Sequence, residues 1–437
     1  MSDNRIKNNM PAFITGIYIA LMLTLFLLWF DGNGYRAITA AKLPVFYILS
    51  GAYIVAVLVA ASIRKCLPKL KDLSAVQWLI IAYLLLTLLS AMCSPKQSKT
   101  WIGATRYEGA ITISIYCLSF LLISLYGRAE KWLLWPLGAG VTALCIVCII
   151  QLFGYNPFKL YPKGLNFYGA GKRYIGQYLG TVGNTGLLAA FFSIVIPVMW
   201  VSILRLRGKK RFALLLPIVL SLLVLVKMNV AAGIVGVAFG GALSLPLVVR
   251  GKKKRRIIAL LLLAALVCVL AFLYLFDIGA GTLHEAHEIL HGNISDSFGS
   301  SRIYIWKNVL SLVPDRLLLG AGPDTLALAD IKPFTRYDAD MGKLFTAHID
   351  TAHNEYLNVL YHQGVFALAA YLGALIVSLI RLIKQSEKNI AAAIMGTAVL
   401  CYCIQAFFGI SMFITAPYFW ISLGLLESSY NKKPKLI

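Results

Sequence analysis

The sequence is poor in charged residues. Only 14% of its 437 residues are Asp, Glu, Lys or Arg, and 18 of these are acidic against 41 basic. A soluble domain of ordinary composition carries about 25% charged residues. Together with a hydrophobic share of 59%, this shortage excludes a soluble globular protein for most of the chain.

Several sequence signatures are also missing. The chain contains no P-loop, no dinucleotide-binding fingerprint and no G-x-S-x-G nucleophile elbow. The eight cysteines do not form a disulfide framework, because six of them lie within apolar stretches. Cys145 and Cys148 have C-x-x-C spacing on one face of an expected membrane helix, where packing is the favoured interpretation.

Hydrophobic runs recur along the chain, and each is long enough to cross a hydrocarbon core roughly 30 Å thick. The first run is too long for a cleaved signal peptide. The sequence predicts an all-α polytopic membrane helix bundle of about twelve transmembrane helices with one long, partly helical extracytoplasmic loop. Residues 1–276 form helices one to nine, 277–357 form the loop, and 358–437 form the last three helices and a cytoplasmic tail. The spans lie near residues 12–30, 44–63, 75–92, 109–126, 132–152, 185–204, 212–228, 230–249, 257–276, 358–380, 390–408 and 410–426.

The net charge of +23 is distributed unevenly between the two sides of this topology. With the N-terminus inside, the inner segments hold 25 of the 41 Lys and Arg but 5 of the 18 Asp and Glu. This is the positive-inside pattern, and such basic runs contact anionic lipid headgroups. We therefore expect membrane lipids and no nucleic acid as partners, with both termini cytoplasmic.

Polar side chains collect in the predicted loop, which holds 11 of the 18 acidic residues and five of the six histidines. We expect it to be folded, because it contains helical apolar periodicity. His284, His287 and His291 share one face of an expected amphipathic helix at the membrane interface. Metal binding is the alternative there, although the spacing is not the H-E-x-x-H of metalloproteases.

The stretch T-A-H-N-E-Y-L-N-V-L-Y-H-Q-G runs from Thr351 to Gly364. Asp350 or Thr351 is expected to cap a helix that enters the bilayer, which places His353 in its first turn. The positive end of the helix dipole favours a neutral imidazole, the form that accepts a proton. The alternative is an interfacial histidine that only satisfies a cap or a lipid headgroup.

A second stretch, S-S-R-I-Y-I-W-K-N-V-L, begins at Ser300. Arg302 and Trp306 are i, i+4 neighbours on an expected short helix, and Gly320 and Gly322 mark a tight turn after it. Arg302 is suited to bidentate phosphate binding. The alternative is a surface arginine that packs on Trp306.

Further polar residues lie at the outer ends of predicted spans. Arg106 and Glu108 belong to R-Y-E-G, Lys172 and Arg173 to G-K-R, and Asn184 to T-V-G-N-T-G. Convergence of several cations on one outer cavity would create an anion site. Lys42, placed in the first outer loop, joins that site or anchors the second helix.

Together these motifs resemble the O-antigen ligase and polymerase superfamily. The shared features are R-x-x-x-W at Arg302–Trp306, G-x-G at Gly320–Gly322 and H-N-x-x-L at His353–Leu357, in one loop before the last spans. R-x-E-G at Arg106–Gly109 and G-N at Gly183–Asn184 also follow the pattern. The chain departs from it at 228–233, where many members carry Ser-Arg-Gly and this sequence has no arginine.

The resemblance implies a glycosyltransferase of the bacterial cytoplasmic membrane. Its donor would be a glycan on undecaprenyl diphosphate, and its acceptor a hydroxyl on a glycan, lipid or protein. The family's loop histidine maps to His353, which Asn354 accompanies, and its loop arginine maps to Arg302. The resemblance also implies weaker contacts to diphosphate or glycan from Arg106, Glu108 and Arg173, with Lys42, Asn184 and Trp306 as further candidates.

The expected mechanism is one inverting displacement that needs no metal or other cofactor. Arginine or lysine would stabilise the charge that develops on the leaving diphosphate, and His353 would accept or orient the proton of the acceptor. A polymerase of lipid-linked repeat units is the nearest alternative, because it uses the same donor. A small-solute transporter is a further alternative, for which the glycines of the span 230–249 give slight support.

Overall fold

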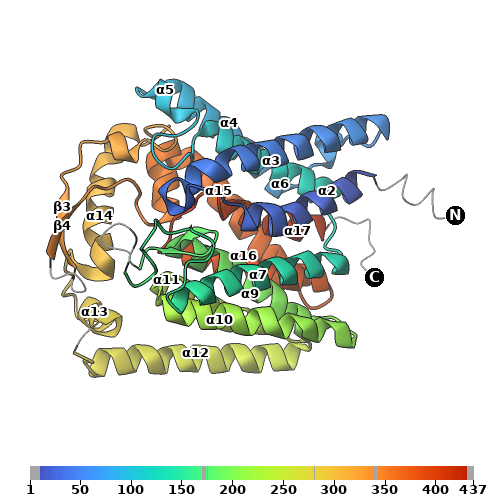
Figure 1. The fold of residues 1–437 in the computed structure, drawn as a ribbon. Helices are drawn as coiled ribbons and strands as arrows, with labels where there is room; N and C mark the ends of the chain where they lie inside the picture. Colours follow the sequence, from blue (N-terminus) through green and yellow to red (C-terminus); the bar gives the residue numbers. More distant parts are fainter. Residues whose placement is uncertain (1–9, 170–173, 175, 280, 339–342, 431–437) are drawn as a thin grey trace.

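A computed structural model describes residues 10–169, 174, 176–279, 281–338 and 343–430. In these residues the fold is a bundle of α-helices with two small antiparallel hairpins (Figure 1). The hairpins pair β1 (Tyr178–Leu179) with β2 (Gly183–Asn184) and β3 (Phe334–Asp338) with β4 (Lys343–Ala347). The fifteen α-helices of the described residues are α2 (Met10–Leu21), α3 (Ile38–Ile63), α4 (Ala75–Cys93), α5 (Gln97–Thr100), α6 (Ala110–Tyr126), α7 (Leu134–Leu152), α9 (Thr185–Arg205), α10 (Leu215–Met228), α11 (Ala231–Val248), α12 (Lys252–Leu275), α13 (Gly281–Leu290), α14 (Phe298–Leu312), α15 (Glu355–Gln385), α16 (Ile390–Ala406) and α17 (Ala416–Ser428).

Each of the twelve apolar stretches expected from the sequence contains a helix. Among the described residues, eight helices are long and apolar enough to cross a membrane: α3, α4, α7, α9, α10, α11, α12 and α15. Here α7 and α10 each count together with the 3-10 helix before them, as Lys131–Leu152 and Lys209–Met228. Three more apolar helices are shorter, and α17 has 13 residues. The all-helical bundle is therefore confirmed in its main features, whereas the number of twelve transmembrane helices stays a prediction.

Hydrogen bonds connect the segments predicted to be cytoplasmic at one end of the bundle. Arg205 donates to the carbonyl oxygens of Val248, Ser386 and Glu387 at 2.7 to 3.0 Å. The Ser428 hydroxyl donates to the Gly127 carbonyl oxygen, and the start of α2 lies at this end too (Figure 1). We call this end, which carries Gly127, Arg205, Val248 and Ser386, the basic end.

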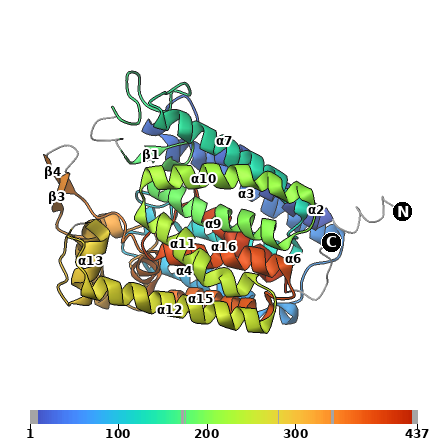
Figure 2. The same ribbon diagram turned by 90° about the horizontal axis from the view of Figure 1, so that it is seen from below.

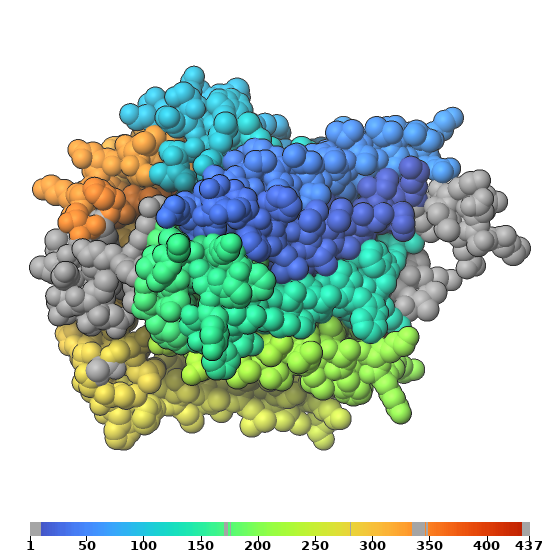
Figure 3. Space-filling view, in the orientation of Figure 1, coloured from blue at the N-terminus to red at the C-terminus, as the bar shows by residue number. Residues whose placement is uncertain are grey.

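The opposite end carries the segment 277–354, which connects α12 to α15. Its described residues contain α13, α14, β3 and β4, at the left of Figures 1 and 2. The described residues of this segment are therefore partly helical, whereas the long extracytoplasmic loop stays a prediction. We call this end, which carries 277–354 and residues 94–109, the motif end; Figure 3 shows the surfaces of these two segments side by side.

The interior of the bundle is built around α9, which packs against α11 and α16 and is buried over most of its length. Glycines allow the close approach of α11 to α16. A Cβ atom on Gly240 would lie 2.8 Å from Cα of Cys401, and one on Gly236 would lie 2.8 Å from Cβ of Gln405. Helix packing thus explains these glycines without a transport pathway. By contrast, α12 buries none of its side chains and lies at the edge (Figure 2).

The predicted span 358–380 lies within α15, which is long and apolar enough to cross a membrane, but the sequence did not predict that α15 breaks at Gly364. Gly364 has φ +85°, and a Cβ atom there would lie 2.2 Å from the Leu318 carbonyl oxygen. The turn 317–322 meets the break: Val365 N–H donates to the Leu317 oxygen, and Gly322 N–H donates to the His362 oxygen. The break separates a short helix, 355–363, at the motif end from a long one, 365–385.

Candidate functional site

A polar cavity of about 610 Å³ lies at the motif end. Its wall combines side chains from segments that are far apart in the sequence, around the short helix 355–363. The lining residues are Tyr83, Arg106, Glu108, Ile113, Tyr116, Asp324, Asp350, Thr351, Glu355, Asn358, Val359, His362, Gln363, Tyr371, Ser411 and Trp420. Arg106 and Glu108 are the two candidates from the sequence that line it.

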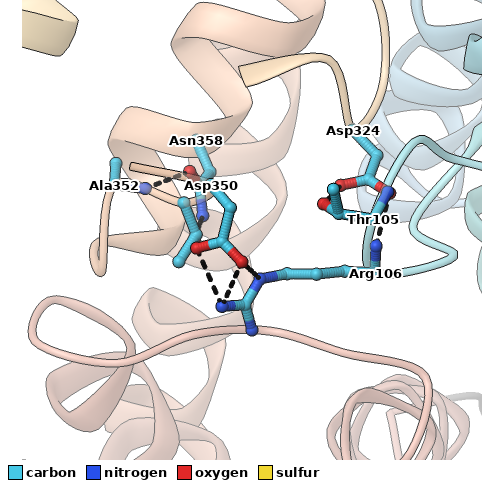
Figure 4. A network of polar contacts seen from close by, with 7 residues as sticks. Thr105, Arg106, Asp324, Asp350, Ala352 and Asn358 are labelled. Carbon is cyan, nitrogen blue, oxygen red and sulfur yellow. Dashed lines mark hydrogen bonds and ion pairs between the residues drawn. The ribbon is translucent and has the colours of Figure 1, made fainter. Parts of the chain in front are cut away.

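Arg106 connects three of these segments (Figure 4). Its guanidinium donates to the Asp350 carboxylate through Nε, at 3.1 Å, and through Nη2, at 3.0 Å. Its backbone N–H donates to Asp324 Oδ2 at 2.8 Å, and Thr105 N–H donates to the same oxygen at 3.0 Å. The R-Y-E-G segment is therefore held between the turn that carries Asp324 and the chain that precedes α15.

The turn around Asp324 depends on the glycines that precede it. Gly320 and Gly322 have φ values of +71° and +106°. A Cβ atom on Gly320 would lie 2.4 Å from the His362 carbonyl carbon, and one on Gly322 would lie 2.5 Å from Ser94 Oγ. The predicted tight turn with close backbone approach is confirmed, and it brings Asp324 to the cavity.

Two glutamates of the cavity are held by tyrosine hydroxyls. Glu355 accepts hydrogen bonds from Tyr371 at 2.6 Å and from Tyr402 at 2.7 Å, one on each carboxylate oxygen. Glu108 accepts one from Tyr116 at 2.8 Å. Burial raises the pKa of Glu108 well above its usual range; the Tyr116 hydrogen bond opposes this shift, and the Asp324 charge adds to it.

Buried aromatic rings form one wall of the cavity. The Trp420 ring stacks near Tyr116, with centroids 6.0 Å apart, and the Tyr371 centroid lies 6.1 Å from Trp420 and 5.4 Å from Tyr83. We call Tyr83, Tyr116, Tyr371 and Trp420 the aromatic wall. Two of its tyrosines, Tyr116 and Tyr371, also donate hydrogen bonds to Glu108 and Glu355, so the wall lies beside these carboxyl groups.

Neither residue of the predicted catalytic pair, Arg302 or His353, lines this cavity. Arg302 begins the regular part of α14, after left-handed residues 299–301, and its Nη1 donates to the Gly299 oxygen at 2.6 Å. One turn later Trp306 donates from Nε1 to the oxygen of Ala352, the neighbour of His353, at 2.9 Å. The R-x-x-x-W and H-N-x-x-L motifs are thus in contact through Trp306.

The predicted position of His353 in a helical first turn is wrong. Helix α15 begins at Glu355, and the Asn354 side chain caps it by accepting from Leu357 N–H at 3.0 Å. His353 precedes the cap with φ +49°. Asp350 and Thr351 are not caps, because Asp350 binds Arg106 and the Thr351 hydroxyl binds Asn358.

Two other candidates have structural roles. Asn184 caps α9 by accepting from Leu187 N–H at 3.1 Å. The placement of Lys42 in a loop is wrong: it lies inside α3, fully buried, and donates to the carbonyl oxygens of Phe26 and Leu27 at 2.7 and 3.1 Å. These are carbonyls at the end of the first apolar helix, so Lys42 caps that helix.

The remaining candidates are Lys172 and Arg173, the histidines of α13 and the cysteines of α7. Lys172 and Arg173 lie outside the described residues. His284 pairs with Asp277 at 2.7 Å, and this hydrogen bond raises the pKa of His284, whereas the ring of His291 stacks on Tyr274. No three His, Cys, Asp or Glu side chains among the described residues are placed to hold a metal ion. Cys145 and Cys148 are buried free thiols, as the packing interpretation predicts.

Sequence comparison supports the resemblance over part of the chain. Residues 216–372 match the model of the O-antigen ligase family. The match supports membership of the O-antigen ligase superfamily. It covers α10 to the first part of α15, including Arg302, Gly320, Gly322 and His353, and it supports an O-antigen ligase/polymerase-like membrane enzyme. No curated protein matches the chain.

Sequence reasoning missed several groups of the cavity. Asp324 had a usable signal, since it directly follows the glycine turn G-A-G-P. Asp350 was considered only as a helix cap. The aromatic wall had no signal, because tyrosine and tryptophan are common in membrane helices, and only the packing of α4, α6, α15 and α17 brings these four rings together.

Proposed function

We propose that the protein is a membrane glycosyltransferase that moves a glycan from an undecaprenyl-diphosphate carrier to an acceptor hydroxyl at the motif end. The observation that carries this proposal is the convergence of the family's separate motifs. Trp306 joins R-x-x-x-W to the residue before His353, and Arg106 joins R-Y-E-G to Asp350, three residues before His353. The G-x-G turn packs against the same short helix.

Arginines supply the charge that a diphosphate leaving group requires. Nε and Nη2 of Arg106 bind Asp350, whereas Nη1 has no hydrogen-bond partner among the described residues, and the side chain is 21% exposed. Arg106 can therefore contact a phosphate oxygen at the mouth while Asp350 orients it. Arg302 would be the second diphosphate contact, and its charge would stabilise the leaving oxyanion.

His353 would accept or orient the proton of the acceptor hydroxyl as that oxygen attacks the sugar carbon. The bond between this carbon and the diphosphate breaks in the same step, so the configuration at the carbon inverts. The step uses no carboxylate nucleophile. The hydrogen-bonded Glu108 and Glu355 would have structural or orienting roles and would not attack the sugar carbon.

The motif end would face the outside of the cytoplasmic membrane. The basic end carries Arg205 and the run that follows it, which the positive-inside rule places in the cytoplasm. The segment 277–354 would then be an extracytoplasmic loop, on the side where lipid-linked glycans are presented. Both chain ends would be cytoplasmic.

The test is reconstitution of the full-length protein in liposomes with an undecaprenyl-diphosphate-linked oligosaccharide and candidate acceptors. We expect His353→Ala and Arg302→Ala each to reduce transfer by about 100-fold or more. His348→Ala and Lys307→Ala are matched controls on the same segment and should keep transfer. Full activity in both His353→Ala and Arg302→Ala would contradict the proposal.

The products separate the ligase from the polymerase. Transfer to a different lipid, a wall polymer or a peptide identifies a ligase. A ladder of longer lipid-linked chains identifies a polymerase with the same donor.

A further inference from the structure

The charge of the polar cavity does not suit a diphosphate. Among its lining residues, the carboxylates of Glu108, Asp324, Asp350 and Glu355 face one cation, Arg106. Asp350 already occupies one edge of that guanidinium. Even where the buried glutamates are protonated, a dianion deep in this cavity would lie near the carboxylates of Asp324 and Asp350 in a partly dehydrated space, which is unfavourable.

The same groups suit the hydroxyls of a sugar. A carboxylate oxygen has two lone pairs, so the oxygens of Asp324 and Glu355 can accept further hydrogen bonds beyond those they receive now. The electron-rich ring faces of the aromatic wall can pack against the C–H groups of a sugar ring.

Two buried polar atoms of the lining point independently to a ligand. His362 Nε2 and Gln363 Oε1 have no hydrogen-bond partner among the described residues, although the two side chains are only 9% and 3% exposed. A buried polar group without a partner destabilises a protein, because it has lost its hydrogen bonds to water. A hydroxyl-rich ligand in the cavity would supply the missing hydrogen bonds.

We propose that this cavity binds a sugar ring without acidic groups, and that the diphosphate of the donor stays at its mouth beside Arg106. The inference rests on the proposed glycosyl transfer and specifies which part of the substrate enters the cavity. Glu355, Gln363 and Trp420 would contact the sugar. Thr351 lines the cavity two residues before His353, so the chain that carries the proposed base borders the cavity.

Gln363→Leu is the decisive variant, because it removes the buried partnerless amide oxygen and keeps a side chain of similar size. The probe is the oligosaccharide released by mild acid from the polyprenyl-linked glycan pool of the host membranes. Its binding to the full-length protein in lipid nanodiscs is measured by calorimetry. We expect wild-type binding, a loss of about 10-fold in affinity for Gln363→Leu, and an unchanged or higher melting temperature without glycan.

Gln405→Leu is the matched control. Gln405 is also buried, and neither end of its amide has a partner among the described residues, but it does not line the cavity. This variant should also keep or raise the melting temperature while glycan affinity stays at the wild-type value. Equal glycan affinity in wild type and Gln363→Leu, or no binding to wild type, would overturn the sugar site.

Inorganic pyrophosphate as a competitor tests which part of the donor enters. We expect pyrophosphate not to displace the released oligosaccharide. If pyrophosphate does displace it, and Gln363→Leu weakens that displacement, the cavity is a phosphate site instead. Because binding is measured without transfer, the two proposals fail separately. Glycan binding without any transfer would refute only the glycosyltransferase, whereas transfer without glycan binding would refute only the sugar site.

Discussion

Arg106 and Asp350, which are 244 residues apart in the sequence, form a bidentate ion pair with Nε–Oδ2 at 3.1 Å and Nη2–Oδ1 at 3.0 Å. The pair connects the chain before α6 to the chain before α15, so it holds two of the motif segments noted in the sequence together. Both side chains are partly exposed, 21% for Arg106 and 39% for Asp350. The pair therefore fixes the relative position of the two segments more than it adds to the free energy of unfolding.

A double-mutant cycle with Arg106→Gln and Asp350→Asn should give a coupling of about 0.5–1 kcal/mol in thermal unfolding, because partial exposure screens the pair. Each single variant should lower the transfer rate by more than this coupling energy would account for, because Asp350 orients the Arg106 guanidinium. The Lys307–Asp296 pair, at 2.6 Å but 61% and 54% exposed, is the control and should show a coupling near zero. Transfer that is unaffected in Asp350→Asn would argue against an orienting role.

Trp306→Phe tests whether Trp306 positions the chain next to His353 or only packs against neighbouring rings. Phe keeps the ring that packs near Phe407 but loses the Nε1 hydrogen bond to the Ala352 oxygen. We expect a stability loss of about 0.5–1.5 kcal/mol and a reduced kcat, because the chain next to His353 is less well fixed. Thermal unfolding and initial transfer rates measure the two effects, and Trp135→Phe on the exposed face of α7 is the control. An unchanged kcat would remove Trp306 from the positioning residues.

Gly364→Ala should disrupt the break in α15. The new Cβ atom would meet the Leu318 carbonyl oxygen at 2.2 Å, and φ of +85° is unfavourable for alanine. We expect destabilisation by more than about 2 kcal/mol, seen as a lower melting temperature or a loss of folded yield. Gly241→Ala, on a helix with no neighbouring atom within 4 Å, should instead stabilise by about 0.5–1 kcal/mol. Similar behaviour of the two variants would contradict the described break.

Glu108→Gln should alter the pH dependence of stability. Burial raises the pKa of Glu108 in the folded protein above the 4.5 of the unfolded chain. The folded state then binds more protons than the unfolded state, so the stabilising contribution is complete below pH 4.5 and decreases as pH rises through the folded pKa. Melting temperatures between pH 4 and 9 should decline less steeply in Glu108→Gln, whereas Glu288→Gln should follow the wild-type profile.

The positions of the helices could be predicted because each apolar run must satisfy its own backbone hydrogen bonds. The same local reasoning identified Arg302 and Trp306 on a helix and the turn at Gly320 and Gly322. It misplaced Lys42 and the start of α15, because helix boundaries depend on which polar side chain reaches the first N–H groups. Asn354, rather than Asp350, does so here.

Composition and order of residues thus determined that this chain is a helical membrane bundle, and the order of its charges predicts which end lies inside. Only the tertiary structure decided which polar residues meet. The break at Gly364 turns a short helix across the motif end, so that Tyr371, sixteen residues after Glu355, donates to its carboxylate. Because contacts of this kind join segments whose sequence separation carries no information on distance, the polar cavity and its aromatic wall could not be read from the chain.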